Sequence, residues 1–571
     1  MDVVVEDVTD RDAGGVDEVA KPGAGDPPTE RARPGRALLV AVLVAVNLPV
    51  VVATVRALLD GWQPVGDNGV LLVRARDVGT SHTPLLGSWT SASMVLDVDF
   101  NNPGPLYFDA VAPAIKLLGP WVGLAVGVML LNMAASSLAV VVARRLCGAE
   151  SMVAVAIVVV GLQFAMGSAL LFDVWQPNAL VLPFFAFLVV ITVLATGDLA
   201  MAPWALGLGS LLVQTHMSHA VLVATLTAAA TLACVLALRR RGQGAVWRRP
   251  LLWTAAVGVL AWVQPLIEQF TGRGDGNLTR IVEAASSGEA TTIGWDRAPR
   301  LMAETMVRGP WFTRDAYGKA IPPIAADAPA SGAVTFGPAV AVLVVAGLVL
   351  VGLTLWARRT GQRGLCTLAA MATVALATGY VALATAPVNS AGISLHQMRW
   401  LWPIAALATA AGLVALFSLP RQRPTARLRA LAAGVAVAVA VAVANLPTHL
   451  SASHGPTEDA PSLASAQQLV GQLGALEGRD TVRYDPTGLL FAEPYSGLTF
   501  AEMQDRGIPF VFDDEGFIRQ FGEGRRDDGS ATLRLWQVEG DEALEVPPGA
   551  ERVALAEGPS GPVALFVEPI G

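Results

Sequence analysis

The chain has 571 residues, of which 53% are hydrophobic and only 15% are charged, and its mean hydropathy is +0.52. Soluble proteins contain about 25% charged residues, so this deficit, concentrated in long apolar runs, excludes an ordinary soluble protein and indicates a polytopic membrane protein. The net charge of -8 says little about partners, because acidic residues gather in the two tails and basic residues in short loops. The three cysteines fit neither a disulfide framework nor a zinc site.

The N-terminal 35 residues are acidic and rich in Gly and Pro, and we expect them to form a disordered tail. Arg31, Arg33 and Arg36 directly precede the first apolar run, which extends from Ala37 to Leu59. Because basic residues flank the cytoplasmic ends of membrane spans, this arrangement predicts a cytoplasmic N-terminus.

Apolar runs of a length suited to crossing a bilayer recur as far as residue 444. After Ala37–Leu59 they cover Trp121–Ala143, Met152–Leu171, Ala179–Ala195, Pro203–Val213, Ala220–Leu238, Leu251–Leu266, Pro338–Trp356, Leu365–Ala384, Leu401–Phe417 and Leu428–Ala444. The sequence therefore predicts about 11 transmembrane helices within residues 36–445. The fifth run is short for a full crossing, and its boundary with the sixth is the least distinct.

Arginine clusters test this count. They follow the second, sixth, eighth and tenth runs, at residues 144–145, 239–249, 358–363 and 421–429. With eleven spans every cluster falls on the cytoplasmic side, whereas a miscount by one would break the agreement. The external side then receives loops 60–118 and 271–336, the turn 173–178, the segment 387–400 and everything after residue 445.

Residues 446–571 have the composition of a soluble domain. Helical spacing at Ser465–Leu476 and short strand patterns at Asp480–Tyr484, Ile508–Phe512, Leu533–Val538 and Val563–Val567 predict a small external α/β domain. The short cytoplasmic loops contain no glycine-rich phosphate-binding motif, so the sequence gives no support for a nucleotide-driven mechanism. No basic patch interleaved with aromatic residues marks a nucleic-acid-binding surface.

The polar segment from Trp62 to Asp109 is the strongest candidate for a functional site. If the substrate is a sugar on a polyprenyl phosphate, the reacting bond lies at the membrane surface, because the lipid stays in the bilayer. Transfer then needs a carboxylate to accept the acceptor proton and cationic groups to hold the leaving phosphate. Asp67 offers the carboxylate, and Arg74 and Arg76 offer the charge, on a segment whose apolar residues 70–73 suit the bilayer surface.

Each of these residues also has a simpler interpretation. Asp67 and Asn68 follow a glycine and are equally suited to capping a helix that begins at Gly69. Arg74 and Arg76 are equally suited to anchoring lipid head groups. Both interpretations stay open on residue chemistry alone.

Further polar residues of the external segments are candidate substrate-binding groups. In the first loop they are Asn68, His82, Asn101 and Asn102, and in the other segments they are Asp173, Trp175 and Glu268. The alternatives are a wet interface for His82, a rigid turn for the sequence NNPGP, and an ordinary helix end for Glu268. His216 and His219, spaced i and i+3, lack the further ligands that a zinc site needs, so we interpret them as lining polar groups.

The order of these features resembles the GT-C superfamily of membrane glycosyltransferases, which includes protein O-mannosyltransferases, the lipid A aminoarabinose transferase and arabinofuranosyltransferases. The resemblance covers residues 37–445 and rests on Asp67-Asn68, Arg74-Ala75-Arg76, Thr83-Pro84-Leu85, the Asn102–Phe108 step and the late segment His396–Pro403. It implies that Asp67 is catalytic and that Arg74, Arg76, His396 and Arg399 bind the donor phosphate. Two positions depart from the family pattern. Asn68 replaces a second acid, which weakens any carboxylate-pair metal site, and Asn102 replaces a lysine.

The resemblance implies transfer of a sugar from a polyprenyl-phosphate donor on the external face of the membrane. The composition, rich in Ala, Val, Arg and Gly, indicates a high-GC bacterium, so we expect a cell-envelope glycan or lipid as the acceptor and the plasma membrane as the location. The resemblance implies no cofactor and leaves a divalent metal open. Two other functions stay open: a polytopic transporter or lipid flippase, and a non-catalytic membrane protein that binds cell-wall polymer. No internal repeat of the kind that many transporters show is visible. Sugar transfer, substrate flux or polymer binding without turnover would separate the three.

Overall fold

The computed structural model describes residues 33–96, 98–241, 247–272, 274–286, 291–308, 335–388, 395–419, 423–451, 460–489 and 493–570. Nearly all of the expected N-terminal tail, and much of the 271–336 loop, lie outside these residues. The chain divides into a first unit, Met1–Val40, of which only the start of the first helix is described, and a second unit, Ala41–Gly571, which contains everything else.

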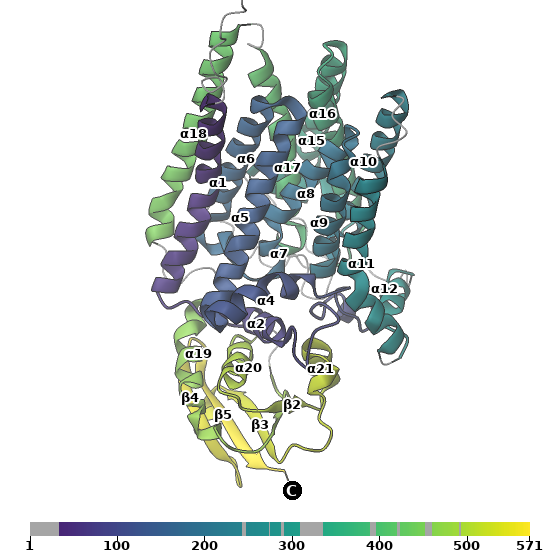
Figure 1. Ribbon diagram of the computed structural model, residues 1–571. Helices are drawn as coiled ribbons and strands as arrows, with labels where there is room; N and C mark the ends of the chain where they lie inside the picture. Colours follow the sequence, from purple (N-terminus) through teal and green to yellow (C-terminus); the bar gives the residue numbers. More distant parts are fainter. Residues whose placement is uncertain are drawn as a thin grey trace, which may run out of the picture. The chain divides into compact units, whose positions relative to one another are not determined.

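Among the described residues, ten helical segments are long and apolar enough to cross a membrane. They are formed by α1 (Arg33–Leu59), α5 (Pro120–Cys147), α6 (Ala149–Leu171), α7 (Gln176–Ala179) with α8 (Val181–Ala195), α10 (Ala220–Arg241), α11 (Arg248–Thr271), α15 (Phe336–Arg359), α16 (Arg363–Ala384), α17 (Leu401–Ser418) and α18 (Pro424–Ser451), as Figure 1 shows. The short fifth run corresponds to α9 (Ala202–Thr215), which is apolar but shorter than the others. The predicted polytopic helical fold is confirmed, including the distinction between the fifth run and the rest.

Short helices occupy the segments between the spans. They are α2 (Asp67–Asp77), α3 (Ser93–Leu96), α4 (Leu106–Leu118), α12 (Asn277–Ser286), α13 (Ala298–Ala303) and the helical turns Leu199–Met201, Met217–His219, Glu304–Arg308 and Leu395–Met398. Gly119 joins α4 to α5 with a φ of 84°, a conformation that only glycine adopts without strain. The direct α4–α5 corner follows from this glycine.

Ion pairs and hydrogen bonds gather several arginine-bearing loops at one end of the helices, which we call the arginine end. Arg427 pairs with Glu150 at 2.6 Å, and Arg145 pairs with Asp198 at 2.7 Å. The Arg241 guanidinium donates to the Thr196 carbonyl at 2.9 Å. The loops between α5 and α6, between α8 and α9, and after α10 therefore meet, as the count of spans requires. Which end faces the cytoplasm stays a prediction of the positive-inside rule.

The C-terminal region forms a mixed five-stranded sheet with helices, so the predicted α/β domain is confirmed (Figure 1). Its elements are α19 (Leu463–Val470), β1 (Val482–Asp485), α20 (Ser496–Asp505), β2 (Phe510–Phe512), α21 (Glu515–Phe521), β3 (Leu533–Glu539), β4 (Glu551–Gly558) and β5 (Gly561–Pro569). The strand order is β2-β1-β3-β5-β4. β1 is parallel to β2 and β3, whereas β5 is antiparallel to both β3 and β4.

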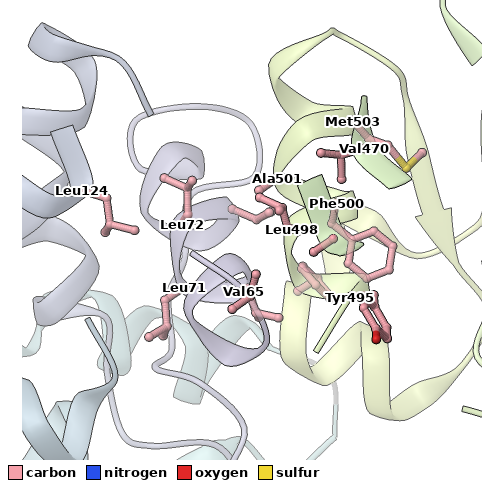
Figure 2. Packing of buried hydrophobic residues seen from close by; sticks show 14 of the residues in the cluster. Val65, Leu71, Leu72, Leu124, Val470, Tyr495, Leu498, Phe500, Ala501 and Met503 are labelled. Atoms are coloured by element: carbon pink, nitrogen blue, oxygen red, sulfur yellow. The ribbon is translucent and has the colours of Figure 1, made fainter. Parts of the chain in front are cut away.

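One hydrophobic cluster joins α2 to both α5 and the C-terminal domain (Figure 2). Leu71 and Leu72 of α2 belong to it together with Leu124 of α5 and Leu498 of α20, and all four side chains are at most 2% exposed. The expectation that residues 70–73 lie on the bilayer surface is therefore wrong. Protein covers α2 on both sides, and this removes its apolar residues from lipid and water alike.

Candidate active site

Asp67 is the first residue of α2, and its side chain reaches away from the helix. Gly66 is the N-cap, with a φ of 56°, and no side-chain hydrogen bond caps the helix. The exposed Asp67 carboxylate instead accepts a hydrogen bond from the indole N–H of Trp175 at 3.1 Å. The capping interpretation thus receives no support from the geometry, and the carboxylate is directed toward the turn before α7.

Asp173 lies beside this contact and organises the turn. Its buried carboxylate accepts hydrogen bonds from the amide of Asn178 at 2.6 Å, from the amide of Asn68 at 3.1 Å and from the backbone N–H of Trp175 at 3.1 Å. Burial raises the pKa of Asp173 to about 6, although these hydrogen bonds and the charge of Arg399 oppose the rise. The turn therefore ties both Asn68 and Trp175, and through Trp175 the Asp67 carboxylate, to one buried acid.

The Asp173 carboxyl should make stability depend on pH. Because its pKa is about 6 in the folded protein against an ordinary 3.8, the folded state binds more protons than the unfolded state between these values. Stability should therefore fall by up to about 3 kcal/mol as the pH rises through this window. Asp173→Asn removes the titration, so its unfolding midpoint should lack this part of the slope between pH 4 and 7. Identical slopes for the two proteins would contradict the assignment.

The late segment meets the same turn. The imidazole of His396 lies against the indole of Trp175, with ring centroids 4.5 Å apart. Arg399 is only 2% exposed, and its charge lowers the pKa of Asp173. Desolvation, with the charges of His216 and Arg399, lowers the pKa of His396 to about 3, so its imidazole is neutral and can donate or accept but carries no charge. Asp67 contacts Trp175, and Trp175 contacts His396. Arg399 acts on the same turn through its positive charge, which lowers the pKa of Asp173.

The environment of Asp67 is crowded although its side chain is exposed. Desolvation by the surrounding protein raises the pKa of its carboxyl, the Trp175 hydrogen bond lowers it, and the charge of Glu493 raises it. Glu493 belongs to the C-terminal domain, and the carbonyl of the next residue, Pro494, accepts a hydrogen bond from the Gly66 N–H at 2.9 Å. The C-terminal domain therefore contributes to the surroundings of Asp67.

Arg74 and Arg76 are held elsewhere. The buried Arg74 guanidinium donates to the Phe521 carbonyl, and Arg76 pairs with Asp505 at 3.0 Å. Both partners belong to the C-terminal domain. Desolvation lowers the pKa of Arg74 to about 10, which still leaves it charged at neutral pH. This placement favours a role in holding the C-terminal domain over the phosphate-binding role that the resemblance implied.

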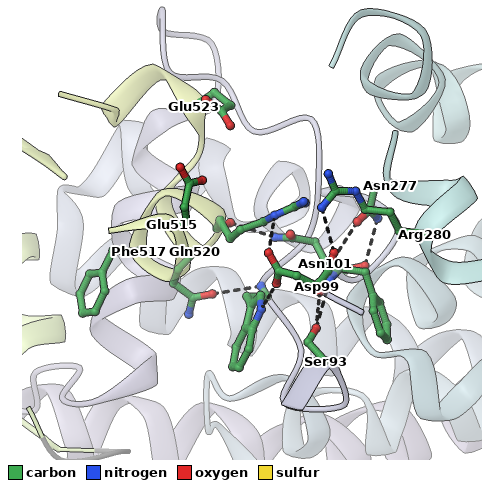
Figure 3. A network of polar contacts seen from close by, with 12 residues as sticks. Ser93, Asp99, Asn101, Asn277, Arg280, Glu515, Phe517, Gln520 and Glu523 are labelled. Atoms are coloured by element: carbon green, nitrogen blue, oxygen red, sulfur yellow. Dashed lines mark hydrogen bonds and ion pairs between the residues drawn. The ribbon is translucent and has the colours of Figure 1, made fainter. Parts of the chain in front are cut away.

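Asn101 also joins segments that are distant in sequence (Figure 3). Its backbone N–H donates to the Asn277 side chain at 2.8 Å, and its amide donates to the carbonyls of Gly87 and Arg519, both at 3.0 Å. The nearby Asp99 pairs with Arg519 at 2.7 Å. Asn101 thus connects the first loop, α12 and α21, and the contacts that it makes are those of a structural junction.

The remaining predicted residues have similar fixed partners. The Asn102 side chain accepts from the Met217 N–H at 2.9 Å, which joins the first loop to the helical turn that precedes α10. Glu268 accepts from the N–H of Asn277, the first residue of α12, at 3.0 Å. His82 is half-buried, and its imidazole lies close to Gly524. A Cβ added at that glycine would come within 2.9 Å of the ring. None of these contacts involves Asp67, Asp173 or Trp175.

The structure adds two residues that the sequence analysis did not select. Asn178 could have been found, because it ends the compact turn that contains Asp173. Glu493 follows no recognisable motif, and only the folded chain shows its effect on Asp67. Within the described part of the chain, no group of three or more His, Cys, Asp or Glu side chains is arranged to hold a metal ion.

Comparisons with known proteins support the fold. No family model and no curated protein matches the sequence. The structure is similar to that of ArnT from Cupriavidus metallidurans bound to undecaprenyl phosphate, with a TM-score of 0.54, 14% identity and coverage of 92% of this chain and 97% of that chain. The apo form of the same protein gives a TM-score of 0.51, 12% identity and coverage of 94% and 98%. At these identities the similarity shows the fold alone, and at that level the predicted resemblance is confirmed.

Proposed function

We propose that this chain, a polytopic membrane protein with an ArnT-like fold, is a glycosyltransferase that takes a sugar from a polyprenyl-phosphate donor. The observation that carries the proposal is the hydrogen bond from Trp175 to Asp67. The ring contact between Trp175 and His396, and the positive charge of Arg399 that lowers the pKa of Asp173, extend it to the late segment. These residues come from three segments between spans, and they form one site with a carboxylate, an aromatic face and a buried cation. The ligand named for ArnT, undecaprenyl phosphate, supports the donor class.

In the proposed reaction, Asp67 accepts the proton of the acceptor hydroxyl while that oxygen attacks the anomeric carbon of the donor sugar. The bond between this carbon and the phosphate oxygen breaks, and the polyprenyl phosphate leaves with the bonding electrons. The raised pKa of Asp67 makes its carboxylate a better base than an ordinary aspartate. Arg399 supplies positive charge toward the phosphate, and the neutral His396 offers a hydrogen bond.

The acceptor is a cell-envelope glycan or lipid on the external face of a bacterial plasma membrane. The test is transfer from a synthetic polyprenyl-phosphate sugar by the purified full-length protein in nanodiscs, with envelope extract as acceptor. Release of free polyprenyl phosphate and a labelled envelope product are expected. Movement of the intact donor across the bilayer without cleavage would indicate a flippase instead, and retention of polymer without turnover would indicate a binding protein.

Arg399→Ala should weaken donor binding by roughly tenfold to a hundredfold, the effect of losing a hydrogen bond to a charged group. The protein should remain folded, which the recovery of a monodisperse sample would show. Donor affinity can be measured by competition with unlabelled polyprenyl phosphate. Arg76→Ala is the matched control, because Arg76 pairs with Asp505 and should leave donor affinity unchanged. Equal losses in the two variants would remove Arg399 from the phosphate site.

The proposed orientation can be tested by labelling single cysteines, in a background without native cysteines, with a reagent that does not cross membranes. Ser530→Cys, at an exposed position of the C-terminal domain, should react in intact cells. Arg240→Cys, exposed at the arginine end, should react only after the membrane is opened. The reverse pattern would invert the topology and place the C-terminal domain in the cytoplasm.

A further inference from the structure

The carboxyl ends of β1 and β3 form a distinctive place in the C-terminal sheet. The two strands are parallel neighbours, yet the chain passes from β1 to β2 on the other side before it enters β3. In open sheets of parallel strands, ligands bind outside the carboxyl ends where the strand order reverses in this way. The side chains at the carboxyl ends of β1 and β3 are therefore candidates for binding a ligand.

Four polar side chains converge there: Tyr484, Glu493, Gln537 and Glu539, which we call the β1–β3 cluster. Tyr484 pairs with Leu535 in the register, so it shares a face of the sheet with Gln537 and Glu539, because alternate residues of a strand share a face. The Gln537 amide donates to Glu493 at 2.8 Å and to Glu539 at 3.1 Å. A single amide therefore lies between two carboxylates.

Two buried atoms of the cluster lack partners. Gln537 is 4% exposed and Tyr484 is fully buried, yet the amide oxygen and the phenol oxygen have no hydrogen-bond partner among the described residues. Burial raises the pKa of Tyr484, and the negative charges of Glu493, Asp485 and Glu539 raise it further. Buried polar atoms without partners are rare in folded proteins, and each calls for a water or a ligand.

The cluster also adjoins the proposed reaction centre. Glu493 directly precedes Pro494, whose carbonyl accepts from the N–H of Gly66 at 2.9 Å. Gly66 in turn precedes Asp67, and the charge of Glu493 reaches the Asp67 carboxyl. Glu493 is therefore the member of the cluster that connects it to the segment carrying Asp67.

The chemistry of the cluster restricts what it can bind. The carboxylates of Glu493 and Glu539 and the amide oxygen of Gln537 are hydrogen-bond acceptors, and Glu493 already accepts from the backbone N–H groups of Tyr495 and Ser496. The Gln537 amide already donates to both carboxylates, so among the described residues the Tyr484 hydroxyl is the donor of the cluster that is not engaged. A matching ligand presents several O–H donors and no negative charge, since the two carboxylates would repel a phosphate. Within the described residues no set of ligands suited to a metal ion includes them. A hydroxyl-rich glycan without acidic groups meets these requirements.

We propose that the β1–β3 cluster is a subsite for an uncharged glycan acceptor, holding hydroxyl groups of sugar units beyond the one that reacts at Asp67. The subsite rests on the proposed glycosyl transfer and gives its acceptor a chemical class. Glu493 and Glu539, both half-buried, form its rim, and Tyr484 and Gln537 form its floor. The C-terminal domain then selects the acceptor, whereas the helical part of the chain holds the donor.

Tyr484→Phe is the sharpest test, because the phenol oxygen makes no hydrogen bond within the described protein and its removal keeps the ring contacts with Phe500 and Phe512. The probe is the mixture of neutral oligosaccharides released from bacterial envelope polysaccharide. Its binding to the full-length protein in nanodiscs is measured by saturation-transfer NMR. Tyr484→Phe and Gln537→Met should each weaken binding by roughly tenfold, the effect of about one hydrogen bond. Tyr380→Phe, which removes a hydrogen bond to Trp295 elsewhere, should leave binding unchanged.

The possible outcomes are separable. Asp67→Asn should bind the oligosaccharides normally while losing transfer, so normal transfer by this variant refutes the proposed function without touching the subsite. Absence of a signal from the wild-type protein, or unchanged binding by Tyr484→Phe, overturns the subsite and leaves a buried water as the partner of the two atoms. A rise in the unfolding midpoint with magnesium chloride alone, lost in Glu539→Gln, would replace the glycan by a cation and also overturn it.

Discussion

Asp67→Asn should lower the turnover of sugar transfer by roughly a hundredfold or more, the usual scale for loss of a general base. The amide keeps the shape of the side chain and can still accept a hydrogen bond from the Trp175 indole N–H, now 3.1 Å from the carboxylate. It cannot accept a proton from the acceptor hydroxyl. Expression, donor affinity and the unfolding midpoint should therefore change little, and the loss should appear in kcat.

Asp60→Asn is the matched control for this experiment. Asp60 follows α1, pairs with Arg56 at 3.2 Å and lies only a few residues before Asp67. Its replacement removes a carboxylate of the same loop and should leave turnover unchanged. If Asp67→Asn transferred sugar at the full rate while Asp67→Ala lost stability, Asp67 would be a structural residue of α2 and the catalytic role would be refuted.

The pH dependence of kcat gives a second test of the role of Asp67. Desolvation raises the pKa of Asp67, so the base is protonated and inactive up to a higher pH than an ordinary aspartate would be. The acidic limb of the kcat profile should report this group. It should be absent from the residual activity of Asp67→Asn, because the amide does not titrate.

The membrane-spanning part of the fold could be predicted because burial of apolar side chains in the bilayer dominates its free energy. Bilayer thickness fixes the length of an apolar helix, so hydropathy alone located the spans, including the short α9. The C-terminal domain was harder. Its strand β4, Glu551–Gly558, was missed because its sequence ERVALAEG contains three charged residues and two alanines, which are poor strand formers. Its antiparallel pairing with β5 decides its conformation.

For the site, the sequence could predict which segments lie at the same end of the helices, but not which side chains contact one another. A consistent count of spans puts the loops that carry Asp67, Asp173 and Arg399 at the same end, and the structure indeed brings these segments together. Arg74 and His82 could not be assigned in this way. Their partners, Phe521 and Gly524, lie more than four hundred residues later in a domain whose docking leaves no local sequence signal.

The contact of α2 with α20 explains why that docking matters. The two helices approach so closely at a pair of glycines that a Cβ on Gly497 would come within 2.0 Å of the Gly66 carbonyl oxygen, and one on Gly69 within 2.3 Å of the Gly497 carbonyl carbon. Backbone atoms cannot yield as a flexible side chain does. The helix that begins with Asp67 is therefore positioned by direct backbone contact with the C-terminal domain.

Gly497→Ala should consequently separate α20 from α2 and lower transfer activity by roughly a hundredfold, because a displacement of about 1 Å at a reacting group has an effect of this size. The cost in stability should be about 1–3 kcal/mol, as for other overpacked contacts. Gly474→Ala is the control in the same domain, since the nearest atom to its new Cβ is 3.8 Å away.

The displacement itself can be measured where Arg76 and Asp505 pair at 3.0 Å. Cysteines at these two positions, in a background without the three native cysteines, should be joined efficiently by a short bifunctional reagent. Adding Gly497→Ala should reduce this cross-linking, whereas adding Gly474→Ala should not. Full transfer activity and unchanged cross-linking in the Gly497→Ala protein would show that α2 holds Asp67 in place without the C-terminal domain.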